Sequence, residues 1–147
     1  MLNDREKVMQ LKRNFESYSY YYYAIKEVEL KLEELQTRLD GLSSPRIQEV
    51  FIENKSYKNN IIELTEKKDR LHKKKVGYQK KIDALFAIVD LIHDKRDKMI
   101  IQDYYFNKIK MSDMCKKYNY HEKVISRKVN KILLQIIREY LYQDLEI

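Results

Sequence analysis

The chain has 147 residues, of which 30 are Lys or Arg and 23 are Asp or Glu, which gives a formal net charge of +7. A single Cys excludes an intramolecular disulfide, no apolar run reaches the ~20 residues of a membrane span, and the first ten residues are too charged for a signal peptide, so we expect a cytoplasmic protein. Two Gly and one Pro favour long helices, and the positive charge favours an anionic partner such as nucleic acid.

The first predicted element is a helix over about residues 4–40. Apolar residues recur here at alternating steps of three and four, which is typical of a coiled-coil seam. The seam residues are Leu11, Phe15, Tyr18, Tyr22, Ile25, Leu32, Leu35, Leu39 and Leu42. Gly41 and Pro45 follow and stop a helix, so a loop is expected over residues 41–55.

A second long helix is predicted over about residues 56–93. Its seam residues are Ile61, Leu64, Lys68, Leu71, Lys75, Tyr78, Ile82, Leu85, Val89 and Ile92. Two helices of similar length joined by a short loop predict an antiparallel helical hairpin over residues 1–93. In such a hairpin Tyr22 should lie near Lys75, and Gly77 should leave room for tyrosine rings.

Two features of this hairpin each allow two interpretations. The run Tyr20–Tyr23 could form a partner-binding patch, or surround Tyr22 in the core with half-exposed rings. The stretch Lys67–Lys81 holds eight basic residues and one acid. It could contact a DNA backbone or RNA polymerase, or it could be an ordinary solvated helix face.

The last third, residues 94–147, is predicted to form a small helix-turn-helix domain. Met111, Met114 and Cys115 give a short helix its apolar stripe, and a recognition helix over about 122–133 follows. The expected buried residues of that second helix are Val124, Ile125, Val129, Ile132 and Leu133. Asn119 should take the left-handed conformation of the turn, and His121 should cap the recognition helix.

The open face of the recognition helix carries side chains that suit DNA. Lys116 to Lys131 contains six basic residues and one acid, a net charge of +5, which is typical of a phosphate-binding surface. The residues expected to reach bases in a major groove are Lys123, Ser126, Arg127 and Asn130. The residues expected to favour phosphates are Lys116, Lys117, Lys128 and Lys131.

The segment from Leu91 to Leu133 resembles region 4 of sigma-70-type factors, the domain that reads promoter −35 elements. The matching features are the polar break Leu91–Asp94, the aromatic pair Tyr105-Phe106 that closes a helix from Arg96, the pair Met114-Cys115, and Ile125, Arg127-Lys128 and Val129 in the recognition helix. Met111 stands where the family usually has Trp or Tyr, and Asn119 stands where it usually has Gly.

The layout of the whole chain resembles the ArpU/RinA-type regulators of phages and prophages. A long helical part precedes a region-4-like end, and the break Gly41–Pro45 interrupts the helical part. The resemblance implies an activator of late genes that binds double-stranded DNA, with the hairpin as a spacer, an oligomerisation arm or a contact for RNA polymerase. The apolar extension through Ile136, Ile137, Tyr140 and Leu141 should pack on the hairpin or on a second subunit, which would give a homodimer.

We expect no enzymatic activity, metal or cofactor. His72, His93 and His121 lie far apart and lack zinc-ligand spacing with Cys115, and the chain has neither a Gly-rich phosphate loop nor a Ser nucleophile motif. Two other functions stay open. One is a small DNA-packaging subunit of a phage terminase, and the other is a scaffold that binds a sigma factor or polymerase without reading DNA.

Overall fold

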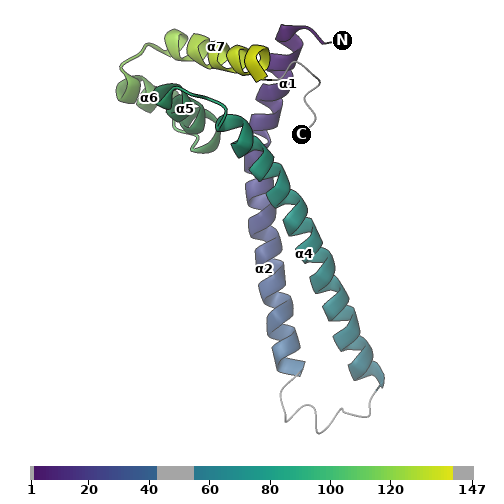
Figure 1. Cartoon of the computed structure of the whole chain (residues 1–147). Coiled ribbons are helices and arrows are strands. Elements are labelled where there is room, and N and C mark those ends of the chain that lie inside the picture. Colours follow the sequence, from purple (N-terminus) through teal and green to yellow (C-terminus); the bar gives the residue numbers. More distant parts are fainter. Residues whose placement is uncertain (1, 43–54, 141–147) are drawn as a thin grey trace. The chain divides into compact units, whose positions relative to one another are not determined.

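A computed structural model describes the backbone of residues 2–42 and 55–140, and every regular element in these two ranges is a helix (Figure 1). The all-α prediction is therefore confirmed for this part of the chain. The predicted loop over 41–55 lies largely outside the described residues, as does Leu141 at the end of the predicted C-terminal extension. No helix within the described ranges has the length and apolar character needed to cross a membrane.

The chain divides into two compact units. One consists of the described residues of Met1–Tyr20 and Lys81–Ile147, and the other is Tyr21–Lys80. The sequence had suggested a division at residue 93, with the whole N-terminal part in the hairpin. The observed grouping differs because the first helix belongs to the same unit as the C-terminal helices.

The unit Tyr21–Lys80 is an antiparallel helical pair formed by α2 (Tyr18–Leu42) and α4 (Lys55–Val89), which lie side by side in Figure 1. The ring centroids of Tyr21 and Tyr78 are 6.1 Å apart. Further along α2, Glu29 Oε1 lies 3.4 Å from Lys75 Nζ. Because positions that rise along α2 meet positions that fall along α4, the two helices run in opposite directions.

Two details of the predicted pairing are wrong. Tyr22, which the sequence analysis placed in the seam, is 41% exposed, and the ring of Tyr21 instead lies beside that of Tyr78, while Lys75 pairs with Glu29. A Cβ atom built on Gly77 would meet nothing within 4 Å, so this glycine does not make room for a ring. At the tyrosine run, the face of α2 that contacts α4 therefore contains Tyr21 and not Tyr22.

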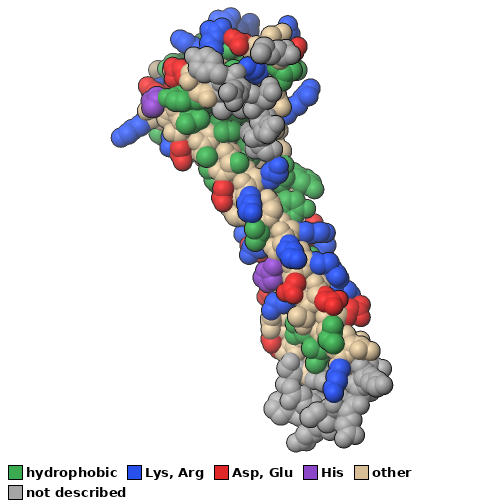
Figure 2. Space-filling model, turned by 45° about the vertical axis from the view of Figure 1, so that its right-hand side comes forward, with side chains coloured by type: hydrophobic (Ala, Val, Ile, Leu, Met, Phe, Trp, Pro, Cys, Tyr) green, Lys and Arg blue, Asp and Glu red, His purple; other side chains and the backbone are tan. Residues whose placement is uncertain are grey.

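The basic stretch of α4 is partly matched by acids of the same unit. Lys67 pairs with Glu63 at 3.6 Å and Lys75 pairs with Glu29, while Lys68 Nζ donates a hydrogen bond to Gln36. On the face seen in Figure 2, Lys and Arg side chains are interspersed with Asp and Glu side chains along the hairpin. These contacts favour a solvated helix face over a continuous cationic track.

The other unit begins with α1 (Asp4–Glu16), the first part of the helix that the sequence predicted over residues 4–40, which is interrupted at Ser17. Asn3 caps α1, and Ser17 separates it from α2. The N–H of Ser17 donates to the carbonyls of Arg13 and Asn14, and its hydroxyl also donates to the Asn14 carbonyl. Serine hydroxyls compete with helical backbone bonds in this way, so a break here has a local cause.

The end of α4 from Lys81 to Val89 also belongs to this unit, and four further helical elements follow it (Figure 1). They are α5 (Lys95–Ile101), the π-helical turn η1 (Gln102–Phe106), α6 (Met111–Tyr118) and α7 (Glu122–Tyr140). Leu11 and Phe15 of α1 are fully buried in the shared core together with Ile136 and Ile137 of α7. Ile136 and Ile137 of the predicted apolar extension are thus covered by the chain itself, through α1, whereas Tyr140 is 38% exposed.

Candidate nucleic-acid interface

The connection between α6 and α7 is a tight turn built by two residues. Asn119 has φ 56° and ψ 43°, the left-handed conformation, and its N–H donates to the carbonyl of Cys115. His121 Nδ1 accepts a hydrogen bond from the N–H of Lys123 at 3.3 Å, and its carbonyl accepts from the N–H groups of Val124 and Ile125. Both predictions about this turn, the left-handed Asn119 and the His121 cap, are confirmed.

The α7 helix has one buried and one open face. Its buried residues are Ile125, Val129, Ile132, Leu133, Ile136 and Ile137. The predicted base-contacting residues Lys123, Ser126, Arg127 and Asn130 are all exposed, and so is Lys131. At 100° per residue these side chains fall on the side away from the core, so the structure gathers them on one surface.

Val124 was predicted to be buried, but its side chain is 40% exposed. Ile125 and Val129 already fill the contact with the core, and a neighbouring position lies about 100° further around the helix. Val124 therefore lies on the open surface of the first turn of α7. An apolar side chain at this place can contact the methyl group of thymine in a major groove.

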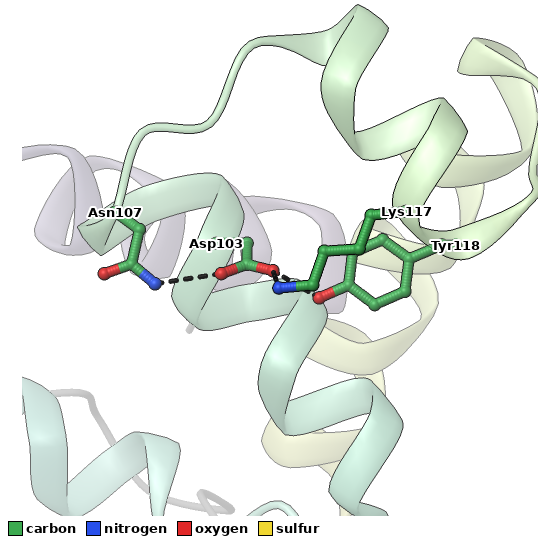
Figure 3. A network of polar contacts seen from close by, with 4 residues as sticks. All are labelled: Asp103, Asn107, Lys117 and Tyr118. Carbon is green, nitrogen blue, oxygen red and sulfur yellow. Dashed lines mark hydrogen bonds and ion pairs between the residues drawn. The ribbon is translucent and has the colours of Figure 1, made fainter.

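Lys117 is held by a buried carboxylate, as Figure 3 shows. Asp103 of η1 is 4% exposed, and its Oδ2 accepts a hydrogen bond from Lys117 Nζ at 2.7 Å. Asn107 Nδ2 donates to Asp103 Oδ1 at 2.9 Å, and the Tyr118 hydroxyl donates to Oδ2. Lys117 was predicted to contact phosphate, but its ammonium group instead ties α6 to η1.

The ionisation of this network follows from its contacts. Burial alone would raise the pKa of Asp103, but hydrogen bonds from Lys117, Tyr118 and Asn107 and the positive charge of Lys117 outweigh it, and the pKa is lowered. The pKa of Tyr118 is raised by burial and by its hydrogen bond to Asp103. At neutral pH Asp103 is therefore a carboxylate and Tyr118 a neutral phenol.

Two of the other predicted phosphate contacts differ in how open they are. Lys128 is half-buried, with Nζ 3.6 Å from Asp97 Oδ1 and 5.8 Å from the centre of the Tyr120 ring. Lys116 is exposed, and its ammonium group makes no ion pair or hydrogen bond within the described part of the chain. Lys116 is thus better placed than Lys128 to bind an added anion.

Arg96 fixes the turn from the α5 side, a role that the sequence did not suggest. Its Nη2 donates to the carbonyl of Tyr118 at 2.6 Å, and its guanidinium carbon lies 5.7 Å and 5.1 Å from the ring centres of Tyr118 and Tyr120. This combination of a hydrogen bond and cation–π contacts holds the start of α7 in place. The only hint in the sequence was the position of Arg96, two residues after Asp94, which caps α5.

The residues described here do not form a site for a metal ion, since no three His, Cys, Asp or Glu side chains among them cluster suitably. The chemistry of the open face is instead that of several cations, one hydroxyl and one amide directed at solvent. No protein family, curated protein or solved structure matches this chain.

Proposed function

We propose that this chain is a sequence-specific, DNA-binding transcriptional regulator of phage or prophage type and an activator of late genes. In this proposal α6 and α7 act as a helix-turn-helix, with α7 in the major groove. The observation that carries it is the set of exposed polar side chains on one face of α7, next to a turn fixed by Asn119 and His121.

The open face has the donors that base recognition requires. Arg127 can form two hydrogen bonds with the O6 and N7 atoms of guanine, and Asn130 can form two with adenine. Lys123 and Ser126 lie within the first turn and a half of α7, where a recognition helix enters the groove most deeply. Because Ile125 and Val129 anchor the opposite side in the core, these side chains start from a fixed backbone.

Phosphate contacts fall to Lys116 and Lys131 in this proposal, with a smaller share for Lys128. Lys116 and Lys131 are exposed on α6 and α7, so they can flank a helix inserted between two strands. Lys117 is left out because its ammonium group is bound by Asp103. The resemblance to sigma region 4 adds RNA polymerase as a second partner, which the helical hairpin would contact.

The first experiment recovers DNA fragments from the protein's own source at roughly physiological salt, since low salt would favour non-specific phosphate binding. Enrichment of one or a few intergenic sites is expected. The site is then titrated with Arg127→Ala and with Arg38→Ala, a matched exposed arginine of α2. Arg127→Ala should lose about 1–3 kcal/mol on the enriched site and much less on random DNA, whereas Arg38→Ala should change neither.

Three outcomes would count against this proposal. Equal losses on specific and random DNA would remove Arg127 from base recognition. Uniform recovery of all fragments would favour the DNA-packaging alternative, which predicts a large ring measurable by light scattering. Complete absence of bound DNA would favour a scaffold that binds a sigma factor or polymerase.

A further inference from the structure

A groove of about 470 Å³ runs between α1 and α7. Arg5, Met9 and Lys12 line it from α1, and Asn130, Leu134 and Arg138 line it from α7. Asn130 is also part of the open face proposed to read bases. The groove therefore begins at the edge of the proposed DNA-contact surface and continues away from it.

The charge of this groove is positive. Arg138 pairs with Asp4 across it, with Nε 3.1 Å from Oδ2, so these two charges compensate each other. Arg5 and Lys12 remain, and neither makes an ion pair or hydrogen bond within the described ranges. The groove thus offers two unmatched cations beside an apolar floor of Met9 and Leu134.

The spacing of the two cations suits a nucleic-acid strand. Arg5 and Lys12 are seven residues apart on one helix, which places them on the same face and about 10 Å apart along its axis. Phosphates of one strand are spaced about 3.4 Å along the duplex axis and further apart along the strand itself, so a separation of about 10 Å spans more than one phosphate. Each cation can therefore contact a different phosphate of a single backbone segment.

We propose that the groove binds the DNA sugar–phosphate backbone next to the major groove occupied by α7, with Arg5 and Lys12 as phosphate contacts. This inference rests on the proposed function and adds α1 to the interface. A helix-turn-helix alone would not contain these contacts. They exist here because α1, from the other end of the chain, packs along α7.

The test compares the double variant Arg5→Gln/Lys12→Gln with Arg13→Gln, which removes an exposed cation of α1 that does not line the groove. Affinity for the enriched site and for random DNA is measured between 50 and 200 mM salt. Two lost phosphate contacts should reduce the slope of log affinity against log salt by about 1.8. The wild type should thus lose roughly tenfold more affinity over this range than the double variant, and Arg13→Gln should match the wild type.

Two further measurements distinguish phosphate contacts by Arg5 and Lys12 from a purely structural role of these two residues. The charge-preserving pair Arg5→Lys/Lys12→Arg should keep the wild-type salt slope. In the unaltered protein, acetylation of Lys12 followed by mass spectrometry should decrease when DNA is bound, while acetylation of Lys58 on the hairpin should not. Both measurements remain informative even if the glutamine variant fails to fold.

An unchanged salt slope in a folded double variant, or undiminished acetylation of Lys12, would overturn the groove proposal while wild-type DNA binding persists. If the wild type binds no DNA, the proposed function itself fails. If acidic proteins protect Lys12 and DNA does not, the groove is a protein-docking site and this inference is wrong.

Discussion

The ammonium group of Lys117 lies 2.7 Å from a carboxylate oxygen of Asp103, fourteen residues earlier in the chain. This contact changes the expected role of one of the cations on α6, next to α7. A lysine that looks available for phosphate in the sequence instead connects two elements of the fold. Its removal should therefore alter stability first and DNA binding only through stability.

Replacement of Lys117 by Ala should lower the free energy of unfolding by about 1–2 kcal/mol, because Asp103 keeps Asn107 and Tyr118 but loses its charged donor. The amount is modest because the Lys117 side chain is 43% exposed. Urea unfolding followed by circular dichroism measures it. DNA affinity well below the melting temperature should stay within about twofold of the wild type.

The matched control is Lys116→Ala, one position earlier on α6. Its stability should stay within about 0.5 kcal/mol of the wild type, as for most surface substitutions. Its affinity should fall on all DNA sequences, with a salt slope reduced by about one. The opposite pattern, with Lys117→Ala losing phosphate contacts and Lys116→Ala losing stability, would contradict this division of roles.

Stability should decrease on the acid side because of Asp103. Its pKa is lowered in the folded state, so the unfolded state binds more protons in acid. The stabilisation is complete above the unfolded pKa of about 4 and is lost as the pH falls through the lower folded pKa. Unfolding free energies measured from pH 6 to pH 2 should show this loss, and Asp103→Asn should flatten the part of the curve that Asp103 contributes.

The turn offers a test of backbone conformation. Asn119→Ala should destabilise the protein by about 1 kcal/mol, because its left-handed conformation is unfavourable for a residue with a Cβ and no local hydrogen-bonding group. Asn119→Gly should be neutral or stabilising by up to about 1 kcal/mol. Lys108 has φ 48°, so Lys108→Gly should also stabilise. Equal effects of Ala and Gly at Asn119 would mean that the turn relaxes.

Val124 provides a test of base recognition that the sequence analysis overlooked. Val124→Ser should leave stability within about 0.5 kcal/mol, because the side chain is exposed. On the enriched site it should reduce the preference for thymine at one position while affinity for random DNA stays the same. Competition between sites with thymine and uracil, which lacks the methyl group, measures this preference. An identical ratio for variant and wild type would remove Val124 from the interface.

The features that the sequence predicted well depend on local chemistry. Asn119 and His121 bond only to residues two to four positions away, so the residue types alone suffice to predict a turn and a helix cap. The buried stripe of α7 from Ile125 to Leu133 repeats every three or four residues, and this repeat also fixes its open face. Val124 was assigned wrongly because, at 100° per residue, it lies beyond the edge of the buried stripe that Ile125 and Val129 form.

The features that the sequence did not predict depend on contacts between distant segments. Leu11 and Phe15 follow the same three- and four-residue spacing as the later seam residues of the first predicted helix. This spacing shows which face of a helix is apolar, but it does not show which other segment covers that face. Their partners proved to lie in the C-terminal part of the chain, because Phe15 contacts the rings of Tyr105 and Phe106 in η1 and α1 also packs along α7. Lys117 looked unmatched because Asp103 lies on another helix, although an acid within the apolar run IIQDYYF was a signal of a buried ion pair.

The packing of α1 on α7 also determines how the protein can be made. Asp4 and Arg138 are 134 positions apart, so the unit that contains α7 joins segments synthesised at widely different times. On the ribosome, α1 emerges early with its apolar face uncovered, while the hairpin segment can pair as soon as α4 emerges. The surface proposed to read DNA is complete only once α7 has been released, so partially synthesised chains should not occupy operator sites.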